Sequence, residues 1–100
     1  MAELGTTLEI TPSDEGFILV GEVDAHTAPQ LKEAVAGREA SVVVLDISGV
    51  TFMDSSGLRV VITATEDARA SGGDLVLAHP SAAVARLLEI SGLTEHLTLR

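Results

Sequence analysis

Short apolar runs alternate with spaced apolar positions along the chain, and this alternation predicts an α/β protein. The runs are rich in β-branched residues, as in buried strands, whereas the spaced positions recur every three to four residues, as on the inner face of a helix. The predicted strands are Thr7–Ile10, Phe17–Val23, Val42–Leu45, Leu75–Leu77 and Leu97–Leu99. The helical stripes between them cover Leu31–Val35, Leu58–Ala68 and Val84–Leu88.

The order of these elements predicts a mostly parallel sheet. Turn residues in Pro12–Gly16 join the first two strands as an antiparallel hairpin. From the second strand onward, a helix separates each strand from the next, so these strands run parallel with right-handed crossovers. We therefore expect a single domain, residues 1–100, with a sheet of about five strands, an antiparallel N-terminal hairpin and helices packed mainly on one face.

Polar residues and glycines mark where the helices are expected to begin and end. Thr27 followed by Gln30 is a capping-box sequence at the first helix, and Ser81 is the expected N-cap of the third. The second helix is expected to begin at Leu58. Glycines favour the left-handed conformation found at helix ends, and the expected stops are Gly37, Gly72–Gly73 and Gly92.

The second helix has a distinct apolar face, whose members are Leu58, Val61, Ile62, Thr65 and Ala68. The outward side carries Arg59, Thr63, Glu66 and Asp67. Val60 also falls there, at about 200° from Leu58 when each residue turns the helix by about 100°. An exposed valine has no role in the core, so we expect Arg59, Val60 and Thr63 to contact a partner protein.

The stretch Val42–Gly57 concentrates the polar residues that could carry chemistry. It begins as a buried strand, crosses a predicted polar turn at Ser48–Gly49 and resumes over Val50–Met53. It ends in Asp54-Ser55-Ser56-Gly57, which brings a carboxylate and two hydroxyls to the start of a helix. Asp24 follows the neighbouring parallel strand and is expected at the same edge of the sheet.

Ser55 and Ser56 allow more than one interpretation. One of them can be the N-cap, aided by Asp54, because a side-chain oxygen there accepts hydrogen bonds from free backbone N–H groups. Alternatively, a serine can be phosphorylated, which would add about −1.5 to −2 charge at the positive end of the helix dipole. A hydrolase is disfavoured, because Met53–Gly57 lacks the first glycine of G-x-S-x-G and no histidine is close in sequence.

Composition narrows the classes of partner and cofactor. A net charge of −9 argues against nucleic acid and anionic membranes and favours a partner with a basic face. The absence of cysteine excludes disulfides, thiolate catalysis and Cys-based metal sites. His26, His79 and His96 lack metal-ligand spacing, and no glycine-rich phosphate loop occurs, so we expect neither metal nor cofactor.

The apolar runs are too short to span a membrane, and the N-terminal segment lacks the basic and apolar regions of a signal peptide. A cytoplasmic location is therefore expected.

Three blocks of the sequence resemble STAS domains, specifically those of bacterial anti-sigma factor antagonists. The first block is Gly21–Ala28, the second runs from Val42–Leu45 into Phe52–Leu58, and the third is Ser81–Leu93. The segment F-M-D-S-S-G-L at Phe52–Leu58 is the most specific of them. The blocks cover most of the chain in the family's order, and the family fold agrees with the predicted alternation.

The resemblance implies a phosphorylation-controlled binding protein rather than an enzyme. Such antagonists bind an anti-sigma factor, which is also an ATP-binding serine kinase with a histidine-kinase-like fold, and thereby free a sigma factor. The kinase modifies the serine that matches Ser55 and ends the binding, and a PP2C-type phosphatase restores it. Ser56 matches a neighbouring hydroxyl, and Asp24 matches an acidic residue near the site. Besides the outward helix face, the expected partner-binding residues are Asp24, Asp54, Ser56 and Gly57.

STAS domains also occur in transporter tails, lipid-transport complexes and stressosomes, so a subunit or ligand-binding module of such a complex is the alternative. Some of these domains lack an acceptor serine, which this chain keeps at Ser55. Family members often continue into a final helix after the last strand, whereas this sequence stops at Arg100. The antagonist is the favoured interpretation.

Overall fold

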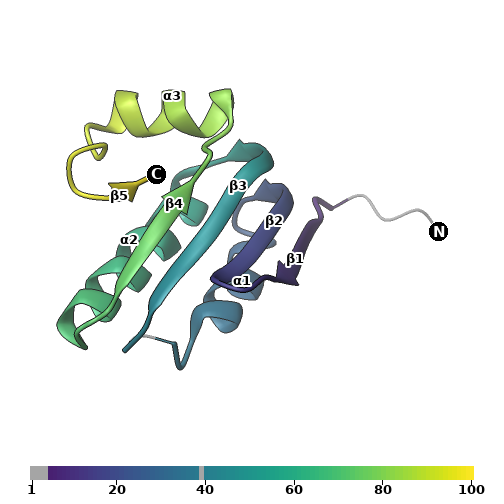
Figure 1. Ribbon diagram of the computed structural model, residues 1–100. Helices are drawn as coiled ribbons and strands as arrows, with labels where there is room; N and C mark the ends of the chain where they lie inside the picture. Colours follow the sequence, from purple (N-terminus) through teal and green to yellow (C-terminus); the bar gives the residue numbers. More distant parts are fainter. Residues whose placement is uncertain (1–4, 39) are drawn as a thin grey trace.

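A five-stranded sheet organises the computed structural model, which describes residues 5–38 and 40–100 (Figure 1). The strands lie in sequence order and are β1 Leu8–Pro12, β2 Gly16–Val23, β3 Val42–Met53, β4 Asp74–Ala78 and β5 Thr98–Leu99. β1 pairs with β2 antiparallel, and the other neighbours are parallel. The predicted mostly parallel sheet with an N-terminal hairpin is confirmed. Residues 1–4, part of the segment expected to lack a signal peptide, lie outside the described residues.

Over the described residues, the alternating order is completed by the helices α1 Ala28–Val35, α2 Ser55–Ala70 and α3 Ala82–Ser91. Figure 1 shows α1 and α2 behind the sheet and α3 across its upper end. Strands and helices share one apolar cluster, whose most buried members include Leu19, Leu31, Leu45, Ile47, Val61, Leu77, Val84 and Leu88. The core is therefore filled mainly by aliphatic side chains, which pack densely without large aromatic groups.

The side of the sheet that faces the viewer in Figure 1 carries no helix. Alternation along the strands points half of their side chains to this side. Exposed apolar residues of β2 and β3 lie there, namely Ile18, Val20, Val42 and Phe52. The helices thus pack mainly on one face, as predicted.

β3 is one continuous strand of 12 residues, so the predicted turn at Ser48–Gly49 is wrong. Its register with β2 slips by one residue twice, once before and once after Val50, as β-bulges allow. At the first slip, Asp46 Oδ1 accepts hydrogen bonds from the backbone N–H of Ser48 at 3.0 Å and from its hydroxyl at 2.8 Å. These two donors, the N–H first, lower the pKa of Asp46. The polar pair therefore shapes a bulge within the strand.

The predicted ends of α3 are confirmed. The Ser81 hydroxyl accepts a hydrogen bond from the N–H of Val84 at 3.3 Å and so caps the first turn. Gly92 adopts a left-handed φ of 74°, and the N–H of Leu93 donates to the carbonyl of Leu88 at 3.2 Å. This is the glycine-dependent stop expected from the sequence.

Thr27 is the N-cap residue of α1, as predicted, but the predicted capping box does not form. The Thr27 side chain makes no capping hydrogen bond, and its hydroxyl donates instead to the carbonyl of Glu22 at 2.6 Å. The Gln30 side chain donates to the carbonyl of Leu8 at 2.6 Å. Both side chains prefer a backbone carbonyl of the hairpin to the helix start. They tie α1 to β1 and β2.

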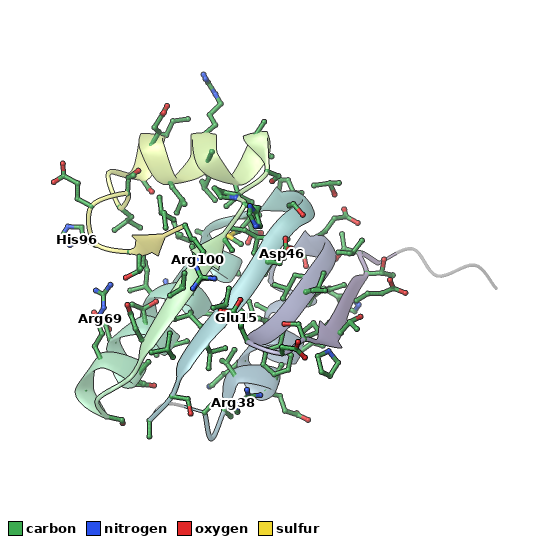
Figure 2. All side chains as sticks on the ribbon, in the orientation of Figure 1. Glu15, Arg38, Asp46, Arg69, His96 and Arg100 are labelled. Atoms are coloured by element: carbon green, nitrogen blue, oxygen red, sulfur yellow. The ribbon has the colours of Figure 1, made fainter. Side chains whose placement is uncertain are left out.

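Arg69, near the end of α2, connects this helix to the last strand (Figure 2). Its guanidinium forms a 3.0 Å ion pair with Asp74 and donates to the His96 carbonyl at 2.7 Å and the Thr98 hydroxyl at 3.1 Å. Thr98 in turn donates to Asp74 at 2.7 Å. Partial burial raises the pKa of Asp74, but the hydrogen bonds from Thr98, Leu75 and Arg69 outweigh it and leave the pKa lowered.

We expect Arg69→Met to lower the free energy of unfolding by about 1–2 kcal/mol, because it removes an ion pair and two hydrogen bonds to the β5 segment. Arg86→Met is the matched control, since Arg86 on α3 is exposed and has no ion pair within the described residues. Urea unfolding followed by circular dichroism measures both. Equal stability of the two variants would contradict this role of Arg69.

Candidate functional site

α2 begins at Ser55, three residues earlier than predicted, because Asp54 rather than a serine is its N-cap. Asp54 Oδ1 accepts hydrogen bonds from the backbone N–H of Ser56 at 2.9 Å and of Gly57 at 3.3 Å. A carboxylate at this position also stabilises a helix through its macrodipole. The interpretation of a serine as the cap is therefore wrong, and both serines lie in the first turn.

Ser55 is exposed to solvent, and its hydroxyl has no hydrogen-bond partner among the described residues. Ser55 is exposed, whereas Ser56 is half-buried. Within residues 5–38 and 40–100, the Ser55 hydroxyl makes no hydrogen bond. Changing or modifying this hydroxyl therefore breaks no hydrogen bond among the described residues.

Gly57 allows the first turn of α2 to lie against the end of β2. A Cβ atom at Gly57 would come within 2.6 Å of the Val23 carbonyl oxygen and 2.7 Å of Val23 Cγ1. The backbone N–H of Asp54 donates to the same carbonyl at 3.2 Å. The last residue of β2 thus fixes the start of α2 through both contact and hydrogen bonding.

Asp24 organises the turn that follows β2. Its Oδ1 accepts hydrogen bonds from the backbone N–H of His26 at 2.9 Å and of Thr27 at 3.2 Å. Its Oδ2 accepts one from the Thr6 hydroxyl at 2.6 Å. The Thr6 hydroxyl has the largest effect and lowers the pKa of Asp24; partial burial raises it, and the N–H groups of Thr27 and His26 lower it further.

The ends of β2 and β3 bring the two carboxylates to one edge of the sheet. Asp24 follows Val23 directly, and the backbone of Asp54 is bonded to Val23. Thr6, which sequence reasoning missed, holds Asp24 from 18 residues away. No local pattern signals such a contact. The partner-binding roles assigned to Asp24, Asp54, Ser56 and Gly57 stay predictions.

A groove of about 220 Å³ lies between α1 and α2. Its lining residues are Lys32, Val35 and Ala36 on the α1 side, and Arg59, Val60, Thr63, Ala64 and Asp67 on α2. Arg59 and Thr63 are exposed, as predicted. Val60 is half-buried and packs against the core, so its predicted free exposure is wrong, because α1 lies beside that side of α2. The α1 residues were missed because periodicity shows a buried face but not its neighbour.

Over the part of the chain that the structure describes, no cluster of three or more His, Asp or Glu could hold a metal ion. His26, His79 and His96 are all exposed. In the same residues, no helix has both the length and the apolar character needed to cross a membrane. The candidate site thus consists of the Ser55 hydroxyl, the Asp24 and Asp54 carboxylates and nearby backbone groups, with the groove beside them.

The mostly parallel sheet and the strand-to-helix junction with its exposed serine define a class of small α/β domain, and comparison with known proteins identifies the family. The family model of the STAS domain matches residues 7–100, so the chain belongs to the STAS domain family.

Several relatives are similar over much of their length. The chain is 35% identical over 103 residues to the anti-sigma-B factor antagonist of Listeria monocytogenes, covering 97% of this chain and 90% of that protein. It is 37% identical over 79 residues to the anti-sigma F factor antagonist of Paenibacillus polymyxa, covering 75% and 68%. The crystal structure of an anti-sigma factor antagonist from Mycobacterium paratuberculosis is 26% identical with a TM-score of 0.74, covering 95% and 85%.

We expect Gly57→Ala to lower the free energy of unfolding by more than about 1 kcal/mol, although alanine favours helices over glycine by about 1 kcal/mol. The added methyl group would meet the backbone oxygen of Val23, which cannot move without breaking its bond to Asp54. Ser56→Ala is the adjacent control and should be close to neutral. Chemical denaturation measures both variants, and a stabilised Gly57→Ala protein would contradict the close approach.

We expect Thr6→Val to raise the pKa of Asp24 toward its ordinary value of 3.8. A lowered folded-state pKa gives stability that is present above the unfolded value and lost as pH falls through the folded value. The stability difference between wild type and variant should therefore be full above about pH 4 and shrink in more acidic solution. NMR titration of the Asp24 carboxyl carbon measures the pKa. Thr11→Val on β1 is the control; equal Asp24 pKa values in all three proteins would exclude this role of Thr6.

Proposed function

We propose that this chain is an anti-sigma factor antagonist whose binding is switched by phosphorylation of Ser55. The unmodified chain binds an anti-sigma factor in the cytoplasm and so releases a sigma factor. The anti-sigma factor is an ATP-binding serine kinase with a histidine-kinase-like fold, and a PP2C-type phosphatase reverses the modification. The names of the Listeria and Paenibacillus relatives, at 35% and 37% identity, support this assignment. Catalysis belongs to the kinase and phosphatase, and this chain is the regulated binding protein.

The exposed, uncommitted hydroxyl of Ser55 is the observation that carries the proposal. A kinase must align the attacking hydroxyl with the γ-phosphorus of ATP, so its target has to enter another protein's active site. Ser55 meets this requirement because it is exposed in the first turn of α2 and bonded to nothing in the described residues. Ser56 is half-buried and is the poorer acceptor.

A phosphate at Ser55 would change binding far more than folding. It adds about −1.5 to −2 charge to a turn that already holds the Asp54 carboxylate. In the free chain, water and the positive end of the helix dipole compensate much of this charge. At an interface the dianion would lose its water, and a desolvated charge without a matched partner costs several kcal/mol. One modification can therefore end binding while the fold survives.

A subunit or ligand-binding module of a transporter, lipid-transport or stressosome complex is the alternative. It requires neither an accessible serine at this turn nor its modification. The relatives called antagonists match over 97% and 75% of this chain, and this extent favours the antagonist.

We expect the kinase that the chain captures from its own cells to transfer one phosphate from ATP to Ser55. Peptide mass mapping locates the phosphate, and Ser71→Ala, at the far end of α2, is the control that should be modified normally. A phosphate on another residue, or none, would reject the switch.

Substitutions at Ser55 should separate binding from stability. Ser55→Ala should bind the kinase as wild type and change the unfolding free energy by less than about 0.5 kcal/mol, because Asp54 supplies the cap. Ser55→Asp should weaken binding at least about tenfold. Titration calorimetry measures the affinities, and wild-type binding by Ser55→Asp would contradict a charge-based switch.

A further inference from the structure

The wall of the α1–α2 groove continues the helical stripe that begins at Ser55. Residues four apart lie on the same side of a helix, so Ser55, Arg59 and Thr63 follow one another along α2. Arg59 and Thr63 line the groove, and Ser55 lies one turn before them. Within the described residues, Arg59 is exposed and has no ion pair or hydrogen bond. Its guanidinium is therefore free to serve either the groove or a group on Ser55.

The geometry points to Arg59 as a shared contact that couples the groove to Ser55. When Ser55 is unmodified, Arg59 holds a carboxylate of the anti-sigma factor whose neighbouring apolar side chain fills the groove. When Ser55 is phosphorylated, Arg59 pairs with the phosphate instead. This inference rests on the proposed function, because it names what the anti-sigma factor presents and how the modification removes it.

The groove fits a protein segment better than a cofactor. Its volume of about 220 Å³ is below the roughly 300–1,000 Å³ typical of small-molecule sites, and it has room for one or two side chains. Val35, Val60 and Ala64 give it apolar walls. A buried apolar side chain of the partner would remove these walls from water, which is the main favourable term in such docking.

Although the net charge of the chain favours a partner with a basic face, charge complementarity at this groove selects an acidic segment of that partner. The chain has only six Lys and Arg against fifteen Asp and Glu, yet Lys32 and Arg59 both line this one groove. Asp67 lies two turns beyond Arg59 on α2, so Arg59 marks the end of the wall nearer to Ser55. A partner carboxylate is therefore favoured at the Ser55 end and disfavoured at the other.

Phosphorylation would compete for the same guanidinium. A phosphoserine dianion carries more charge than a carboxylate and accepts the paired N–H groups of arginine in the same fork geometry. Because the phosphate belongs to the same helix turn, it reaches Arg59 at no cost in association entropy. The partner carboxylate then loses its cation and meets a dianion. This explains how a phosphate just outside the groove lowers affinity without a change in fold.

The pairing can be tested without any partner. The full chain is produced with phosphoserine encoded at position 55, and the second ionisation of the phosphate is followed by ³¹P NMR from pH 4 to pH 8. An unpaired phosphoserine ionises with a pKa of about 6, and a neighbouring cation lowers it. We expect Arg59→Gln to raise this pKa by about 0.5 or more relative to the wild-type chain. Arg86→Gln on α3, the matched control, should leave it unchanged. Equal values in wild type and Arg59→Gln would overturn the pairing.

Binding of the unmodified chain tests the groove. The captured kinase should bind Arg59→Gln and Lys32→Gln roughly three- to tenfold more weakly than wild type, with the difference shrinking at high salt. Arg86→Gln should bind as wild type. If both groove variants bind normally while Ser55→Asp does not, the groove assignment is wrong and the proposed function stands. If no kinase binds or phosphorylates the wild-type chain, the proposed function fails. The assignment of the groove to an anti-sigma factor then fails with it. The ³¹P titration still decides whether Arg59 pairs with a phosphate on Ser55.

Discussion

The contact between the end of β2 and the first turn of α2 is the constraint on which the site depends. A single carbonyl, that of Val23, receives the N–H of Asp54 and stands where a side chain of Gly57 would have to be. This close approach needs a residue without a Cβ, and it fixes the direction in which α2 leaves the sheet. Asp54 then caps the helix, and Ser55 is left outside both the cap and the core. The accessibility of the serine is thus a result of how its neighbours are used.

The few cations of this acidic chain occupy distinct places. Arg69 and Arg100 hold the C-terminal segment: Arg69 through hydrogen bonds to His96 and Thr98, and Arg100 through a 3.3 Å ion pair with Glu15 on the open side of the sheet (Figure 2). Lys32 and Arg59 instead face a groove and have no ion pair among the described residues. Each surface ion pair contributes little stability, so Arg69 and Arg100 serve mainly to position the short strand β5. Lys32 and Arg59 remain available to contact a group that enters the groove.

The strands and helices could be predicted from the sequence because apolar spacing reports directly on burial. Prediction was wrong where one polar side chain had several partners within reach. Thr27 and Gln30 match a capping box, yet their side chains donate hydrogen bonds to carbonyls of the hairpin instead of capping the helix. Ser48 resembles a turn residue, but its bond to Asp46 stabilises a bulge. Contacts between distant segments, such as Thr6 with Asp24 or α1 beside Val60, depend on packing that no local pattern encodes.

The two bulges of β3 determine which of its side chains point to the core and which point to the open side of the sheet. Leu45 faces the core before the first slip, Ile47 within it, Val50 between the two slips, and Met53 after the second. Each slip inverts the alternation of sides, and the second inversion cancels the first. Odd-numbered residues therefore face the core at both ends of the strand, as Leu45 and Met53 do. Each extra residue of β3 is taken up within a bulge, so Met53 still faces the core opposite Val23, where the chain turns toward α2.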